Sequence, residues 1–281
     1  MTKEEKLAKK ELKKQEKKER KELEELYYQK KELNEQIEKE VHDVKKQEYI
    51  EKMTPIWEKR RKLNEAPKRT VLEEIGSAVS HGLGVVFTIV AFVLMLQKSD
   101  TPLKVLATVV YTIAMLFMFL NSTLYHSWKW GTKVKRIWRR FDYTSIYMLV
   151  AGTFAPLQLI ELPKEFGEAG YIWGITYFGV MWLIVITGVT LTCVFGPGRV
   201  KRVNFPLYFV VGWSAISLIP GWLISKNYTL FWWILGGGII YTLGMIPFGL
   251  LRNKKCAHFI WHIVVFLGVI AHFCGLYFGV Y

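Results

Sequence analysis

Hydrophobic and polar positions divide the chain into two different kinds of sequence that meet near residue 74. Beyond that point, long apolar runs alternate with short polar loops. A helix needs about 20 mostly apolar residues to cross the hydrocarbon core of a bilayer, which is roughly 30 Å thick. The runs show no alternation of apolar and polar positions, which argues against a β-barrel. The pattern predicts seven transmembrane helices, at residues 75–96, 103–125, 143–160, 171–194, 205–224, 230–251 and 258–281.

The segment before these runs is dominated by Lys and Glu, with neither Pro nor Gly in its first 50 residues. Glu and Lys three or four positions apart favour a helix in water. A solvated helix or a partly disordered tail is the simplest interpretation, and a coiled coil is the alternative because several apolar residues fall near heptad spacing. Lys30 and Glu40 interrupt that spacing. Its apolar members are Leu23, Leu26, Leu33, Ile37 and Val44.

The predicted fold is therefore all-α: a seven-helix polytopic membrane protein with a charged helical tail. We place the tail at residues 1–70 and the membrane domain at residues 71–281. The three cysteines match neither a disulfide framework nor a zinc spacing. An apolar signal-peptide segment is not found at the N-terminus, where the first long apolar run begins near Ile75.

Charge predicts the orientation of this domain. The chain carries 38 Lys and Arg against 24 Asp and Glu, for a net charge of +14. With the tail in the cytoplasm, the loops at 127–141, 195–204 and 252–257 share its side and hold twelve basic residues and no acidic one. The opposite loops hold four basic residues mixed with four acidic ones. The positive-inside rule predicts a multi-pass plasma-membrane protein with a cytoplasmic N-terminus and an extracellular C-terminus. The excess charge thus indicates orientation, and no nucleic-acid partner is expected.

Five of the six histidines lie in or beside predicted spans, where ionisable residues are costly and mark function. His258 and His262 are four residues apart, so both imidazoles lie on one helix face. His126 closes the second span at the same predicted inner depth. Three histidine nitrogens with an open fourth position are typical of a catalytic zinc site. The metal ligands expected here are therefore His126, His258 and His262, with Zn²⁺ as cofactor.

Two further residues fall at the same depth. Asp142 opens the third span and is the only carboxylate at a predicted span, so it could orient a ligand or a water. Ser122 lies one turn before His126 and faces the same region. Interhelical hydrogen bonding is the alternative role for any of these histidines, and it is favoured for His81 and His272. His272 lies roughly 21 Å along the helix from His258, too far to join the cluster.

Five motifs occur in order along the chain: EEI and SHG within 73–82, NSTLYHS at 121–127, RFDY at 140–143, AGTFAP at 151–156, and HFIWH with HF within 258–273. Together these motifs resemble the bacterial haemolysin III proteins of the PAQR superfamily, which includes the adiponectin and progestin receptors. The resemblance covers residues 71–281 and excludes the tail. It implies a seven-helix bundle with a cytoplasmic N-terminus and an inner-leaflet zinc held by the three histidines named above. Members often have His where Tyr143 stands and Asn where Ser77 stands.

The resemblance implies a zinc-dependent hydrolase of a lipid amide, similar to the ceramidase activity attributed to relatives, or a role in membrane homeostasis. Asp142 would act as base or orienter and Ser122 would position the water. A pore-forming, cytolytic protein is the second hypothesis, although the spans offer no polar stripe. A non-catalytic receptor or scaffold is the third. The expected partner is membrane lipid, and the tail is expected to bind a cytoplasmic partner or to self-associate.

Overall fold

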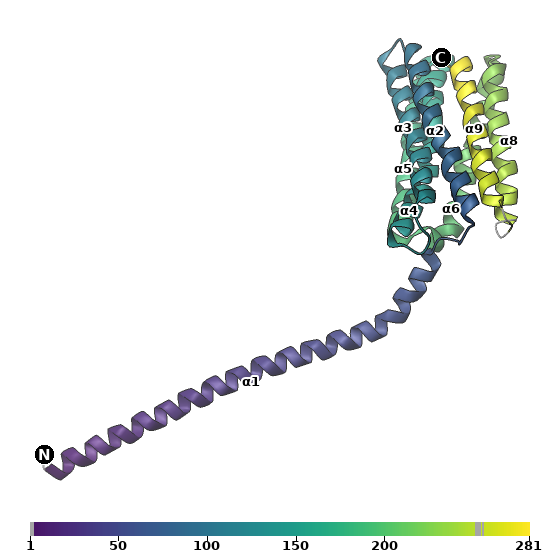
Figure 1. Ribbon diagram of the computed structural model, residues 1–281. Coiled ribbons are helices and arrows are strands. Elements are labelled where there is room, and N and C mark those ends of the chain that lie inside the picture. Colours follow the sequence, from purple (N-terminus) through teal and green to yellow (C-terminus); the bar gives the residue numbers. More distant parts are fainter. Residues whose placement is uncertain (1–2, 251–253, 255) are drawn as a thin grey trace. The chain divides into compact units, whose positions relative to one another are not determined.

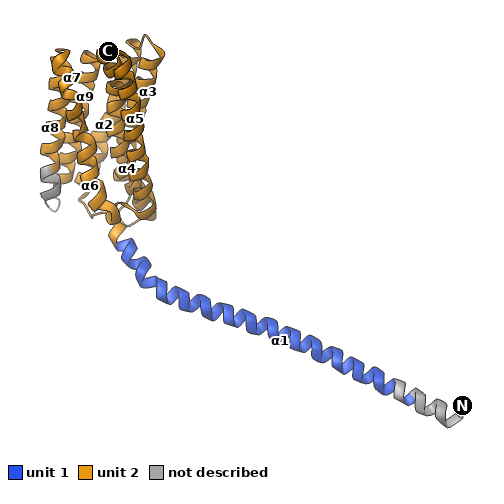
Figure 2. Ribbon diagram, turned by 180° about the vertical axis from the view of Figure 1, so that it is seen from behind, with its two compact units in different colours: residues 1–62 blue, residues 63–281 orange. Residues whose placement is uncertain are grey.

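The structure is a computed structural model that describes residues 3–250, 254 and 256–281. Leu251, at the end of the sixth predicted span, and part of the predicted loop 252–257 lie outside the described residues. The chain divides into two compact units, Met1–Lys62 and Leu63–Tyr281 (Figure 2). Each unit is described by itself below.

The first unit consists of one helix, α1 (Lys3–Asn64), whose last two residues belong to the second unit. Abundant Lys and Glu favour the helix, which also accommodates Pro55. The apolar residues at near-heptad spacing are exposed, for example Leu23 at 67% and Ile37 at 48%. The helical tail is confirmed, whereas coiled-coil pairing with a second chain stays a prediction.

The second unit is a helical bundle without a strand among its described residues. Within the part of this unit that the structure describes, six helical stretches are long and apolar enough to cross a membrane. Large apolar side chains such as Val86, Ile113 and Leu183 are exposed on the outside of the bundle, as expected for helices that are surrounded by lipid. The all-α polytopic fold is therefore confirmed. Its elements are α2 (Val71–Gln97), α3 (Pro102–Ser127), α4 (Lys133–Pro156), η1 (Leu157–Glu161), α5 (Leu162–Phe195), α6 (Pro197–Trp213), η2 (Ser214–Leu218), α7 (Ile219–Ile224), α8 (Tyr228–Leu250) and α9 (Ala257–Gly279).

Two predicted spans, 143–160 and 171–194, fall within one continuous helical stretch, Lys133–Phe195. This stretch has 63 residues, which at 1.5 Å per residue is about 95 Å of helix and far exceeds one bilayer crossing. Gly167 divides it with a non-helical backbone (φ 56°, ψ −132°), a left-handed φ that glycine tolerates. Helix α4, before this break, packs against α5, most of which follows the break. The stretch thus accounts for both predicted spans.

Threonine caps fix where the first three membrane helices begin. Thr70, Thr101 and Thr132 each accept a hydrogen bond from the backbone N–H three residues later, which satisfies a donor left free at a helix start. At Thr70 the cap is reciprocal, because the Glu73 side chain also accepts from the Thr70 backbone N–H at 3.0 Å. The cap starts α2 at Val71, so Glu73 and Glu74 lie in its first turn.

The helices pack so that the beginning and the end of the unit meet. α2 packs against both α3 and α9, and α3 packs against α4. Figure 1 shows α2 beside α9, although residues 98–256 lie between them in the sequence. α9 also packs against α8, which packs against the short α7. This order brings the end of α3, the start of α4 and the start of α9 around the first turns of α2.

Candidate metal centre

Three buried histidines from two helices converge at one point. His126 comes from the last turn of α3, whereas His258 and His262 come from the first two turns of α9. The Nε2 atom of His258 lies 3.2 Å from Nε2 of His126 and 3.0 Å from Nε2 of His262. All three ligand atoms lie within 4.8 Å of one another. The structure thus brings together the three histidines that the sequence predicts as ligands.

The spacing of these nitrogens suits a metal ion. A tetrahedral zinc with Zn–N bonds of about 2.1 Å holds its ligand nitrogens about 3.4 Å apart, close to the two distances in the cluster. A neutral imidazole carries one N–H, so three ring nitrogens facing one another leave lone pairs that a cation can share. The donor set fits zinc, and imidazole also suits copper, iron and nickel. The geometry therefore supports a metal site.

A carboxylate stands behind His126. Glu74 Oε2 lies 2.6 Å from His126 Nδ1, on the opposite side of the ring from the cluster. The same oxygen lies 2.8 Å from Lys135 Nζ, which comes from the first turn of α4. The side chains of His126 and Lys135 have no exposed surface, and that of Glu74 is 17% exposed. Three helices thus meet at one carboxylate oxygen next to the cluster.

The adjacent carboxylate makes a different contact. Glu73 Oε1 accepts a hydrogen bond of 2.6 Å from the backbone N–H of Cys256. Cys256 has a left-handed φ of 64° and immediately precedes α9. Glu73 therefore fixes the start of the helix that carries His258 and His262, without contacting a histidine of the cluster in any described hydrogen bond.

A mainly apolar cavity of about 190 Å³ reaches the cluster from inside the bundle. His258 and His262 line it together with Ser122 and Asp142. Ser122 is fully buried and Asp142 is 9% exposed. Both residues predicted to assist the metal thus share a cavity with two of the three predicted ligands, although their catalytic roles stay predictions.

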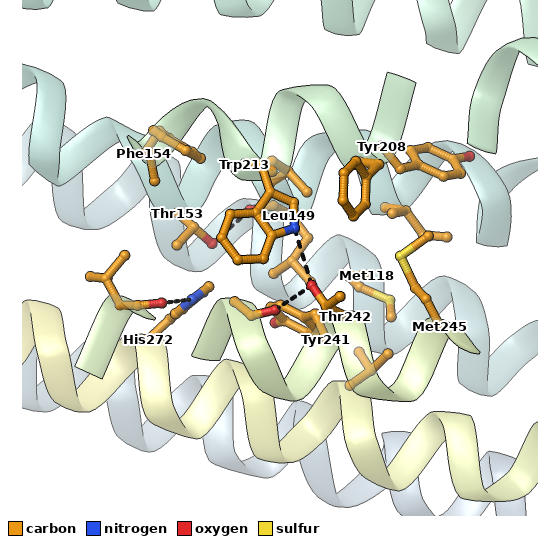
Figure 3. Close-up of a pocket in the computed structure, with 18 of the residues that line it drawn as sticks. Met118, Leu149, Thr153, Phe154, Tyr208, Trp213, Tyr241, Thr242, Met245 and His272 are labelled. Atoms are coloured by element: carbon orange, nitrogen blue, oxygen red, sulfur yellow. Dashed lines mark hydrogen bonds between the residues drawn. The ribbon is translucent and has the colours of Figure 1, made fainter. Parts of the chain in front are cut away.

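The cavity extends away from the cluster toward the far ends of α6, α8 and α9. Figure 3 shows Thr153, Trp213, Thr242 and His272 around this part of it. Trp213 Nε1 donates to Thr242 Oγ1 at 3.1 Å, which joins α6 to α8. His272 Nε2 lies 3.2 Å from the carbonyl oxygen of Ile234. His272 thus lies apart from the cluster and bridges two helices.

The sequence-based interpretation missed two residues of this centre. Asp142 was expected to be the only carboxylate at a span, and this was wrong because the Thr70 cap starts α2 early enough to include Glu74. Lys135 was expected to be one basic residue of a cytoplasmic loop, yet its side chain is buried. The Thr-x-x-Glu pattern at residues 70–73 could have revealed the early helix start. A single sequence does not indicate which faces of two helices meet behind His126.

Comparison with known proteins identifies relatives of the membrane unit. A sequence model of the family described as haemolysin-III related matches residues 69–273. The chain is 32% identical over 212 residues to Hemolysin-3 of Bacillus cereus, covering 74% of this chain and 92% of that protein. It is 30% identical over 215 residues to a Hemolysin-3 homolog of Bacillus subtilis, covering 75% and 96% of the two chains. The human monocyte to macrophage differentiation factor is 25% identical over 216 residues, covering 75% and 85%.

Proposed function

This chain belongs to the haemolysin-III related family of membrane proteins, and we propose that it is a zinc-dependent hydrolase of a membrane lipid amide. One observation carries the proposal. Three buried imidazole nitrogens converge beside a cavity that is mainly apolar and that also holds a carboxylate, Asp142. Such a cavity suits an acyl chain, and a few polar groups at one end suit the bond to be cleaved.

The proposed reaction divides the work among the residues at this end of the cavity. His126, His258 and His262 would hold zinc, which lowers the pKa of water toward neutrality and polarises a carbonyl group. Asp142 would accept the proton of the attacking water and return it to the departing amine nitrogen. Ser122 would hydrogen-bond the water or the substrate carbonyl. A C–O bond forms, the amide C–N bond breaks, and the products are a carboxylic acid and an amine.

The excess of basic residues in the predicted loops 127–141, 195–204 and 252–257 supports a cytoplasmic position for this end of the bundle. The substrate would then be a lipid of the inner leaflet. Its acyl chain would lie along the cavity, toward the region of Thr153 and His272.

Metal content and lipid turnover test the proposal together. We expect about one zinc per chain in the purified protein and its loss in the His262→Ala variant. His272→Ala is the matched control, because it removes a second histidine of α9 that lies outside the cluster. Asp142→Asn should retain zinc but lose turnover of a long-chain lipid amide. A protein without stoichiometric zinc, or an Asp142→Asn variant with full turnover, would overturn the proposal.

Ion flux through liposomes distinguishes the alternative in which the protein forms a pore. Flux that persists in the His262→Ala variant, with no lipid turnover in the native protein, would favour a pore over a hydrolase. Zinc retention without turnover in the native protein would favour a receptor or scaffold.

A further inference from the structure

The hydrogen bond between His126 and Glu74 has a defined donor and acceptor. A carboxylate accepts hydrogen bonds and does not donate them when ionised, so Nδ1 of His126 is the donor to Glu74 Oε2 across their 2.6 Å separation. A neutral imidazole that donates from Nδ1 presents its Nε2 lone pair, and Nε2 is the atom that faces His258 at 3.2 Å. Glu74 thus selects the form of His126 that can bind a cation at the cluster.

Lys135 forms an ion pair with the Glu74 carboxylate. Its Nζ lies 2.8 Å from the same Oε2 atom and 4.7 Å from the centre of the Tyr125 ring. A buried carboxylate is costly unless a cation compensates it, and a buried ion pair usually adds little net stability after both charges are desolvated. Stability alone is therefore a weak reason for this pair. Its position behind a cluster histidine gives it a second role.

We propose that Glu74 is a positioning residue that fixes the ring orientation and tautomer of His126 for the metal, and that Lys135 holds the Glu74 carboxylate in place. The inference rests on the metal centre of the proposed function and adds residues from two further helices to it. Outer groups of this kind raise the basicity of a ligand imidazole and typically change metal affinity 10- to 100-fold when they are removed. The affinity of the centre would then depend on the packing of α2 and α4 as well as on its three ligands.

Glu73 provides a matched control. It is the neighbouring carboxylate in the same helical turn, and it is also buried. Its oxygens accept hydrogen bonds from Thr70 and from the backbone of Cys256. In Glu73→Gln the amide oxygen can still accept from the Cys256 N–H, so the start of α9 is kept, whereas the hydrogen bonds from Thr70 lose their charged acceptor. The contact behind His126 is left intact.

Cobalt binding to the full-length protein in detergent tests the inference. Co²⁺ reports both affinity, through competition with a chelator, and ligand geometry, through its visible absorption bands. We expect Glu74→Gln to weaken Co²⁺ and Zn²⁺ binding about 10- to 100-fold and to shift the cobalt bands. Glu73→Gln should lower thermal stability while the bands and the affinity stay unchanged.

A double variant distinguishes a local effect on the metal site from misfolding. This control is needed because Glu74→Gln leaves the Lys135 ammonium buried without its anion. Glu74→Gln combined with Lys135→Met removes both charges and should fold, and it should still show the weakened metal binding and the shifted bands. Native affinity and native bands in the folded double variant would overturn the inference and leave the proposed metal centre standing. A native protein that binds neither Co²⁺ nor Zn²⁺ would overturn both the inference and the proposed function.

Discussion

His81 on α2 and His262 on α9 are in direct contact: the centres of the two imidazole rings lie 4.0 Å apart, and His81 Nε2 lies 3.3 Å from the His262 carbonyl oxygen. The carbonyl can only accept, so Nε2 of His81 is the donor. The ring of His81 therefore packs against His262 from the side, and its Nε2 atom is occupied by the backbone. This geometry gives His81 an interhelical role instead of a place in the metal cluster.

We expect His81→Phe to keep the stoichiometric metal but to lose stability. Phe retains a ring beside His262, and the lost hydrogen bond costs about 0.5–1.5 kcal/mol. Thermal unfolding in detergent and metal analysis of the same sample measure the two effects. Loss of the metal at unchanged stability would instead identify His81 as a ligand.

Close packing of α3 and α4 depends on Gly152. A Cβ atom at this position would lie 2.3 Å from Ala114 Cβ and 3.3 Å from the carbonyl oxygen of Val110. The nearer atom belongs to a short side chain that cannot move aside, so the helices must separate. We expect Gly152→Ala to destabilise the bundle by about 1–3 kcal/mol, as measured by denaturant unfolding.

Gly179→Ala is the control for that experiment, because a Cβ atom at Gly179 would meet nothing within 4 Å. Its stability should equal or exceed that of the native protein, since alanine favours a helix over glycine. Equal destabilisation by both substitutions would contradict the packing explanation.

The sequence predicted the spans well because each is an apolar run of the length that a bilayer demands. Helix α9 (Ala257–Gly279) follows the predicted span 258–281 closely. The cluster was also foreseeable, because spacing places His258 and His262 on one face and topology places His126 at their depth.

Other features depend on tertiary packing and had no such signal. The π-helix Leu157–Glu161, which follows Pro156, breaks the regular i to i+4 pattern that periodicity assumes. It brings Glu161, expected in an extracellular loop, to 1% exposure, where Asn227 donates to it at 2.6 Å. The contact between Glu74 and His126 likewise requires knowing which faces of two helices meet.

A buried hydrogen-bond chain joins three helices through Asn204 of α6. Tyr147 on α4 donates to Asn204 Oδ1 at 3.1 Å, and Asn204 Nδ2 donates to Thr192 Oγ1 on α5 at 2.9 Å. Such bonds in membrane proteins average about 0.6 kcal/mol. A double-mutant cycle of Tyr147→Phe and Asn204→Leu should therefore give a coupling energy of about that size. A coupling energy near zero would show that the two side chains contribute independently.

Cysteine labelling tests the predicted orientation. Cys256 is exposed at the start of α9, on the side predicted to be cytoplasmic. Asp100→Cys would place a thiol between α2 and α3 on the opposite side; it breaks the ion pair with Lys104, which contributes little because Asp100 is 70% exposed. A membrane-impermeant maleimide should label the Asp100→Cys site in intact cells, and Cys256 only after permeabilisation. The reverse pattern would invert the predicted topology.

Removal of the charged tail should leave the membrane unit intact, provided that the deletion ends at residue 62. Deletion of residues 1–62 removes the first compact unit only. We expect the remaining protein to keep its thermal stability and its metal content. Tolerance of a truncation follows from the burial and hydrogen bonding of the chain that it removes.

Deletion of residues 1–69 should behave differently, because Asn64, Glu65 and Ala66 form hydrogen bonds with the bundle. The Arg139 guanidinium donates to the Glu65 carbonyl oxygen at 3.0 Å, and Trp130 Nε1 donates to the Ala66 carbonyl oxygen at 2.8 Å. Arg139 is only 7% exposed, so the longer deletion removes a partner from a buried cation. Leaving such a group unsatisfied costs about 1–3 kcal/mol or more. We therefore expect a clearly lower unfolding temperature for the longer deletion, and equal temperatures for the two truncated proteins would show that residues 63–69 do not stabilise the bundle.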